Sequence, residues 1–259
     1  SYGSEYVFNS AGTDYISVSA LDSTHAIIAY RDNGNSNYGT AIIASISGST
    51  ISYGSEYVFN SAGTYDISVS ALDSTHSIIA YCDAGNSYYG TAIIASISGS
   101  TISYGSEYVF NSAATYYISV SALGSDKAII AYCDNGNSNY GTAIIASISG
   151  STISYGSEYV FNSGNTENIS VSALGSDKAI IAYRDDGNSN YGTAIIASIS
   201  GSTISYGSEY VFNSAGTSYI SVSALDSTHA IIAYRDGGNS SYGTAIIATI
   251  SGSTISYGS

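Results

Sequence analysis

The feature that most constrains the fold of this chain is an internal repeat with a period of 51 residues. Its starting motif, Ser-Tyr-Gly-Ser, returns with every copy; 12 positions of the unit vary and 39 are identical in all five copies. Such units bury apolar surface mainly against their neighbours, so we expect a single domain, 1–259. The units are repeat 1 (1–51), repeat 2 (52–102), repeat 3 (103–153), repeat 4 (154–204), repeat 5 (205–255) and a closing segment, 256–259.

Each repeat contains four segments with strand character and none with a helical period. In repeat 1, residues 15–21 alternate in side-chain type, whereas 26–32 and 40–46 are β-branched apolar runs typical of strands buried on both faces. Residues 51–59 combine Tyr, Val and Phe with a central Gly54 that indicates a bulge. Segments rich in Gly, Asn and Ser separate the strands and supply the turns.

Four antiparallel strands in a repeat of about 40–50 residues are typical of β-propellers. We therefore predict an all-β fold, a closed five-bladed β-propeller with four antiparallel strands per blade. The small Ser17, Ser19 and Ala20 suit the crowded inner edge of the ring, and the tyrosine-rich segment 51–59 suits the outer edge. Both termini carry part of the outer-strand motif, so we expect them to complete one blade together and close the ring.

The charge balance excludes two classes of partner. Five Lys and Arg stand against 19 Asp and Glu, a net charge of −14 that repels nucleic-acid phosphates and anionic lipid surfaces. No apolar run approaches the roughly 18–20 residues that a membrane-spanning helix requires. We expect a monomer with no nucleic-acid partner and no membrane insertion.

The two cysteines, Cys82 and Cys133, occupy the same position in repeats 2 and 3. The other repeats carry Arg31, Arg184 and Arg235 at that position. A disulfide requires Cα atoms about 4.4–6.8 Å apart, and equivalent positions of adjacent blades come that close only next to the central axis. We therefore predict two free thiols.

Variation between the copies is concentrated in loops. In an up-and-down blade, the connection between blades and the loop between the second and third strands open on one face. Seven of the 12 varying positions belong to that face, and four more lie on or beside the opposite face. The seven are the positions of Ala11, Gly12, Asp14, Tyr15, Arg31, Asn33 and Asn37.

One polar hairpin motif is invariant, Asp32-x-Gly34-Asn35-Ser36-x-Tyr38-Gly39. It resembles the Asp-box hairpin of sialidase-type propellers, but has Tyr30 at the Ser/Thr position and one extra residue before the aromatic. The resemblance implies that the Asp side chain bonds turn amides; a ligand contact is the alternative. The candidate ligand-binding residues are Asp32, Asn35, Tyr38, Asp83, Asn86, Tyr89, Asp134, Asn137, Tyr140, Asp185, Asn188, Tyr191, Asp236, Asn239 and Tyr242.

Catalytic, metal and cofactor sites are not expected. Sialidase chemistry uses a cluster of arginines in one central site, and here the three Arg occupy one repeat position. The hairpin carboxylates are too few for a tight Ca²⁺ site. Glu5 and its equivalents are expected on a solvated outer edge, and His25 on a loop without metal partners. Tyr6 and Tyr30 are expected to pack between blades with their hydroxyls bonded to backbone.

Tyrosine offers a flat apolar face with a polar tip, which suits sugar rings and other small polar ligands. We therefore predict a non-enzymatic, multivalent, lectin-like module that binds glycans or small polar ligands between blades. In architecture alone it resembles the tachylectin-2 type of five-bladed lectin, and no residue roles are carried over. The alternatives are a structural or adhesive repeat scaffold, natural or engineered, with no small-molecule ligand, and, less favoured, a glycoside hydrolase.

Overall fold

The structure is a computed structural model that describes residues 3–258, and its regular elements are strands β1 to β20 and the short 3-10 helices η1 to η4. No helix in this range has the length and apolarity needed to cross a membrane. The first strands of the repeats are β1 (Thr13–Ala20), β5 (Tyr57–Ala71), β9 (Tyr108–Gly124), β13 (Tyr159–Ala173) and β17 (Tyr210–Ala224). The second strands are β2 (His25–Asp32), β6 (His76–Asp83), β10 (Lys127–Asp134), β14 (Lys178–Asp185) and β18 (His229–Asp236).

The remaining elements follow the same order in each repeat. The third strands are β3 (Tyr38–Ser47), β7 (Tyr89–Ser98), β11 (Tyr140–Ser149), β15 (Tyr191–Ser200) and β19 (Tyr242–Ser251). The fourth strands are β4 (Thr50–Tyr53), β8 (Thr101–Tyr104), β12 (Thr152–Tyr155), β16 (Thr203–Tyr206) and β20 (Thr254–Tyr257). The 3-10 helices are η1 (Asn33–Asn35), η2 (Ala84–Asn86), η3 (Asn135–Asn137) and η4 (Asp186–Asn188).

Consecutive strands of a repeat pair antiparallel, and the two central strands are the most buried. In repeat 1, Ile27 of β2 lies opposite Ser19 of β1 and Ile43 of β3. Both isoleucine side chains are 0% exposed, because neighbouring strands and a neighbouring repeat cover them. This agrees with the apolar, non-alternating sequence of these two strands.

The outer edge of each of repeats 1 to 4 is one interrupted strand. β4 pairs with the end of β3, and the first residues of β5 pair with its beginning. Between them, at Gly54, the chain bends where the sequence indicated a bulge, and a Cβ atom there would lie 2.7 Å from the Ser100 carbonyl oxygen of the next repeat. β5 then continues as the first strand of repeat 2 and pairs with β6, so each long first strand joins two repeats.

The apolar core lies between consecutive repeats. Each of four buried clusters combines side chains from two neighbouring repeats, for example Ile27 and Ile43 with Ile79 and Ile93. On the inner edge, Ser hydroxyl groups accept hydrogen bonds from the backbone amides of the next first strand. Ser70 Oγ accepts from Ala122 N at 3.0 Å, and all four junctions repeat this contact. The small inner-edge residues allow this close approach.

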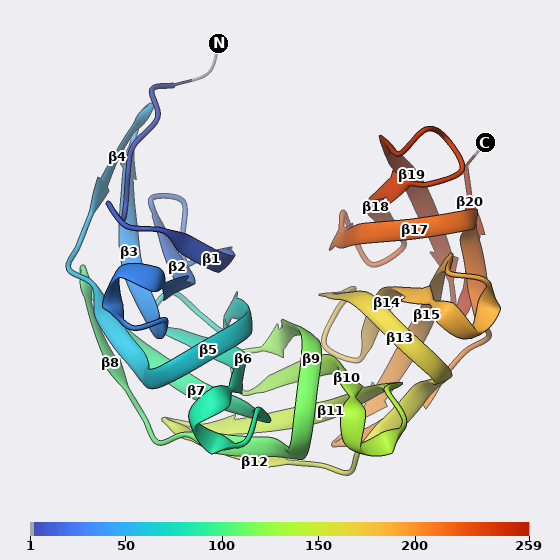
Figure 1. Cartoon of the computed structure of the whole chain (residues 1–259), viewed down its shortest axis with the longest axis horizontal. Coiled ribbons are helices and arrows are strands. Elements are labelled where there is room, and N and C mark those ends of the chain that lie inside the picture. The colour runs from blue at the N-terminus through green and yellow to red at the C-terminus, as the bar shows by residue number, and fades with distance from the viewer. Residues whose placement is uncertain (1–2, 259) are drawn as a thin grey trace.

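Figure 1 shows the repeats along an open arc, with the first strands inside, the fourth strands outside, and a gap between repeats 1 and 5. The predicted closure of the ring is therefore corrected: within residues 3–258, segment 3–12 forms no strand and does not pair with β19. Phe8 packs on Tyr30 of its own repeat, with ring centroids 5.0 Å apart, as Phe59 packs on Tyr81 in repeat 2. The side chains packed between neighbouring repeats set the angle between those repeats. These angles do not bring repeats 1 and 5 together.

Candidate ligand-binding site

The invariant hairpin folds as a 3-10 turn capped by its aspartate. Asp32 is 5% exposed, and its Oδ1 accepts hydrogen bonds from Gly34 N at 2.9 Å and Asn35 N at 3.2 Å. Asn35 is exposed, and Tyr38, the strand partner of Asp32, is half-buried. The turn thus brings the three candidate residues of each repeat together, with the carboxylate directed at the backbone and the amide at solvent.

Four of the five aspartates make the same contact. Asp83, Asp134 and Asp236 each accept a hydrogen bond from the second following amide, at 2.9–3.0 Å. Asp185 makes no such bond, and within the described chain its Oδ1 has no hydrogen-bond partner. An invariant asparagine of the outer edge also holds the carboxylate, as Asn60 Nδ2 donates to Asp83 Oδ1 at 3.0 Å. The sequence of the hairpin does not indicate this second contact, because the asparagine lies on a different strand.

A bulge in every first strand is the largest local departure from the sequence expectation. The register between β1 and β2 shifts between Asp14 and Ser17, and Tyr15 inside the bulge has φ 51°. A non-glycine residue in this left-handed region costs on the order of 1 kcal/mol, and such strain is concentrated at functional sites. The equivalent residues, with φ 48–54°, are Asp66, Tyr117, Asn168 and Tyr219.

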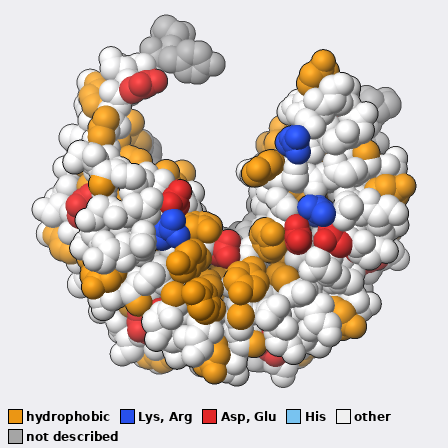
Figure 2. Space-filling view, in the orientation of Figure 1, with side chains coloured by type: hydrophobic (Ala, Val, Ile, Leu, Met, Phe, Trp, Pro, Cys, Tyr) orange, Lys and Arg blue, Asp and Glu red, His pale blue; other side chains and the backbone are white. Residues whose placement is uncertain are grey.

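Bulge residues of repeats 1 to 4 line a cavity of about 490 Å³ on the inner side of the arc. Figure 2 shows hydrophobic side chains gathered there, at the middle of the arc, with acidic and basic side chains on either side. Every residue that lines the cavity occupies a repeat position that varies between copies. They are Tyr15, Asp66, Tyr116, Tyr117, Cys133, Asn139, Asn165 and Glu167.

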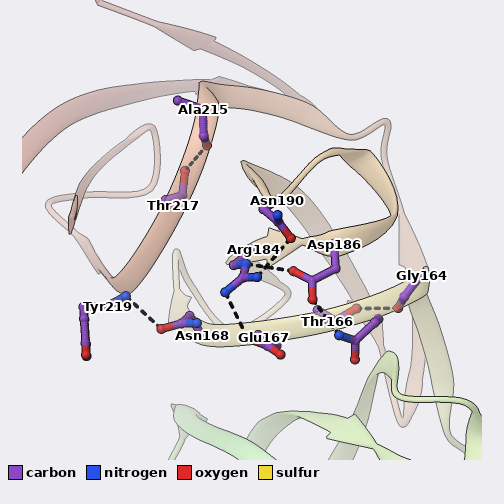
Figure 3. Close-up of polar contacts among 11 residues, drawn as sticks. Gly164, Thr166, Glu167, Asn168, Arg184, Asp186, Asn190, Ala215, Thr217 and Tyr219 are labelled. Atoms are coloured by element: carbon purple, nitrogen blue, oxygen red, sulfur yellow. Dashed lines mark hydrogen bonds and ion pairs between the residues drawn. The ribbon is translucent and has the colours of Figure 1, made fainter. Parts of the chain in front are cut away.

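Two arginines beside the cavity are neutralised within their own repeats. In repeat 4, Arg184 Nη1 lies 3.2 Å from Glu167 Oε2 and its Nε lies 2.7 Å from Asp186 Oδ1 (Figure 3). In repeat 1, Arg31 pairs with Asp14, and hydrogen bonds from Asn33 and from Arg31 hold the pKa of the Asp14 carboxyl below its usual range. The first bulge position is that of Asp14, and both repeats that carry an acidic residue there also carry arginine at the Arg31 position.

Arg31 also contacts two aromatic rings. Its guanidinium carbon lies 5.0 Å from the ring centroids of both Tyr15 and Tyr65, a cation–π arrangement. The two rings are 5.7 Å apart and nearly perpendicular. The inner rim therefore already binds one organic cation, supplied by the chain itself.

Repeats 2 and 3 differ from this pattern. Cys82 and Cys133 replace arginine there, and both are buried free thiols, as predicted. Burial raises the pKa of each thiol to about 12, so both stay protonated at neutral pH. Burial also raises the pKa of Asp66 to about 6, opposed by a hydrogen bond from the Tyr117 amide. Within residues 3–258, no ion pair involves Asp66.

The expected hydrogen-bond partner of Tyr30 was wrong. The Tyr30 hydroxyl donates to Glu56 Oε1 at 2.7 Å rather than to backbone, and the following three repeats repeat the bond. Glu5 and its four equivalents are all exposed, as expected, and in the last four one carboxylate oxygen also accepts the bond from a buried tyrosine. The hydroxyl that bonds to backbone is that of Tyr53, which donates to the Tyr6 carbonyl at 3.1 Å.

The histidines lie on the opposite face. His25 Nδ1 is 3.0 Å from Asp22 Oδ2, and two other repeats have the same contact. In residues 3–258, no group of three or more His, Cys, Asp or Glu side chains is arranged to hold a metal ion.

Comparisons with known proteins identify the fold. No protein-family model and no curated protein sequence matches the chain. Among solved structures, the lectin SapL1, solved with α-methyl fucoside, matches with a TM-score of 0.60 and 13% identity over 94% of this chain and 79% of its own. The fucose-binding six-bladed propeller lectin of Aleuria aurantia matches with a TM-score of 0.58 and 14% identity, over 94% and 77%.

An enzyme shares the same architecture. The NanB sialidase of Streptococcus pneumoniae matches with a TM-score of 0.57 and 14% identity over 81% of this chain, which spans only 34% of the sialidase. At these identities the likeness concerns the fold alone. The chain therefore has an all-β fold of repeated strand units, of the kind found in β-propellers.

Proposed function

We propose that the chain is a non-enzymatic, lectin-like module that binds glycans or small polar ligands at five equivalent sites between neighbouring repeats. The observation that carries this proposal is the recurrence, on one face, of an exposed amide beside a half-buried tyrosine, as in Asn35 and Tyr38. Amides that hydrogen-bond hydroxyl groups and aromatic faces that stack on apolar ring surfaces together suit a sugar.

The roles within each site follow from the turn geometry. Asp32 and its equivalents preorganise the turn, because their oxygens accept bonds from the turn amides. Asn35 and Tyr38 are then the groups that contact the ligand, and the varying residue at the Asn37 position adjusts each copy. Similar propeller lectins that bind fucose support a glycan as ligand. Five weak sites gain roughly 10²–10⁴ in avidity on a multivalent surface.

Glycan-array binding followed by calorimetric titration, beginning with α-methyl fucoside, tests the proposal. We expect saturable binding with a stoichiometry near five per chain. Replacing all five asparagines of the Asn35 position by Ala should abolish binding with little change in stability, because these side chains are exposed. Asp22→Asn, on the opposite face, is the matched control. The proposal would be overturned if no glycan of a broad array bound the chain, or if the Ala variant bound as well as the parent.

A specific observation favours a structural or adhesive scaffold as second candidate. The inner surface of repeat 1 that faces the gap exposes Ile16 and Val18, at 53% and 63%, although both positions are buried in repeats 2 to 4. Under this hypothesis, sedimentation shows association that increases with protein concentration. Val18→Lys should abolish it, and Asp22→Lys should not. A monomer at all concentrations would exclude the scaffold function.

A further inference from the structure

We propose that the cavity on the inner rim is a single binding site for an organic cation with an ammonium or guanidinium head group. The site is asymmetric, because it combines residues of repeats 1 to 4 that differ from their equivalents elsewhere. It uses none of the invariant residues at the Asn35 and Tyr38 positions on which the five proposed glycan sites depend, and it shares with those sites only Asn139, at the Asn37 position of repeat 3. One cation per chain is expected.

The first argument is the aromatic lining. Tyr15, Tyr116 and Tyr117 line the cavity and are 42%, 37% and 36% exposed, so none of the three is fully covered, although Arg31 already lies over the Tyr15 ring. The quadrupole of such a ring attracts a cation over its face, and the attraction is stronger when the cation is desolvated. Arg31 between Tyr15 and Tyr65 demonstrates this mode of binding at the edge of the same cavity.

The second argument is charge. Asp14 and Glu167 each pair with the arginine of their own repeat. In repeat 2 the carboxylate stands one position later, at Asp66, and the arginine is replaced by Cys82. Asp66 is thus a half-buried carboxylate that lines the cavity and makes no ion pair within the described residues. A buried charge without a partner is unfavourable, and a cationic ligand would supply the partner.

The third argument is space. Cys82 and Cys133 are short and buried, whereas an arginine at the same position, such as Arg184, reaches the acidic residue at the first bulge position. The two repeats without arginine therefore leave room where their neighbours have a guanidinium. The cavity volume, about 490 Å³, lies within the range of small-molecule sites.

Three of the lining residues stand on bulges of the same geometry. Tyr15, Asp66 and Tyr117 all occupy the strained left-handed position of their bulges. The scaffold around them is identical between copies, while the bulge residues are among the most variable of the unit. Strain and variation thus coincide at the residues that line the cavity.

Binding of matched cationic and neutral probes to the whole chain tests this inference. Choline is compared with its neutral carbon isostere dimethylbutanol, and methylguanidinium with methylurea, by calorimetry or ligand-observed NMR at physiological salt. We expect one site per chain and at least tenfold tighter binding of each cation than of its neutral counterpart. Equal affinity for cation and isostere, or a stoichiometry of five, would overturn the inference.

The chain itself supplies conservative variants. Asn168 occupies the equivalent bulge position in repeat 4, where its Oδ1 accepts a bond from Tyr219 N at 2.8 Å, so Asp66→Asn should fold normally. We expect Asp66→Asn to weaken cation binding at least tenfold and Tyr117→Asn to weaken it about threefold or more. The controls Tyr219→Asn and Asp22→Asn should bind as the parent does.

The outcomes separate the two proposals. Cation binding without glycan binding would leave this inference standing and remove the lectin-like function. Displacement of choline by a neutral sugar would assign the cavity to glycans and contradict the inference, as would undiminished cation binding by Asp66→Asn.

Discussion

The inner repeats and the two ends of the chain have almost the same sequence but different environments. Ile67 in repeat 2 is 7% exposed, whereas its copy Ile16 in repeat 1 is 53% exposed. Ile94 is fully buried, and its copy Ile247 in repeat 5 is 39% exposed. A repeat thus completes its core only with neighbours on both sides. The same side chain is buried against a neighbouring repeat in one copy and is largely exposed to solvent in another.

Truncation of this isoleucine should show the largest difference. We expect Ile67→Ala to reduce the free energy of unfolding by about 2–5 kcal/mol, because it leaves a cavity between repeats. Ile16→Ala should cost less than about 0.5 kcal/mol, since its side chain is mostly exposed. Denaturant unfolding measures both variants. Equal losses would mean that the surface of repeat 1 is covered in solution.

A glycine pair tests the open end of repeat 5. A Cβ atom at Gly90 would lie 2.4 Å from the Phe110 ring, whereas at Gly243 it would meet nothing within 4 Å among the described residues. Gly90→Ala should therefore destabilise the protein by about 1–3 kcal/mol through overpacking, and Gly243→Ala should be nearly neutral. Thermal unfolding compares them. A destabilising Gly243→Ala would show that Phe8 reaches repeat 5 and that the arc closes.

Two carboxylates should give stability opposite dependences on pH. Burial raises the pKa of Asp66 to about 6, so its contribution is fully present below the unfolded pKa and is lost as pH rises through about 6. Asp66→Asn should therefore stabilise the protein above that pH by about 1–2 kcal/mol, allowing for partial exposure. The difference in the free energy of unfolding between Asp66→Asn and the parent should decrease towards pH 4.

Asp22, on an exposed hairpin of repeat 1, is the comparison. Hydrogen bonds from the Thr24 amide and hydroxyl lower its pKa to about 2, so its contribution is lost as pH falls through that value. Unfolding curves of Asp22→Asn and Asp66→Asn across pH should differ from the parent in opposite senses. Parallel profiles would contradict the assigned environments.

The smallest effect concerns the inner-edge hydroxyl groups. Ser70→Ala removes the 3.0 Å bond to Ala122 N, and we expect a loss of about 1 kcal/mol. Ser223, its copy at the open end, is exposed, so Ser223→Ala should change stability by less than the error of the measurement. Hydrogen exchange at the Ala122 amide gives a second readout, because only Ser70→Ala should accelerate it.

The repeat predicted much of this architecture, because the same pattern of strand and turn residues occurs in all five copies. The strands, the break at Gly54 and the free thiols follow from side-chain patterns and turn residues. For Asp32 the sequence left two alternatives, a bond to the turn amides or a ligand contact, and the structure shows the bond to the turn amides. Closure was predicted wrongly, because the angle between repeats depends on packing that a period does not express.

The cavity was missed for a different reason. Alternation in residues 15–21 predicted a regular strand, and nothing in it marks Tyr15 as left-handed, since tyrosine rarely takes that conformation. One signal was available. The two adjacent positions of Asp14 and Tyr15 vary strongly between copies inside a strand that is otherwise invariant through residue 21.

The uniform junction between repeats has a consequence for how binding is encoded. Since the same serines and apolar side chains join every neighbouring pair, the repeats should fold equally well in any permuted order. Only an order that puts repeat 2 directly before repeat 3 sets Asp66 against Tyr117. A change in the order of the repeats would thus change which side chains line the binding cavity, while the contacts that join the repeats would stay the same.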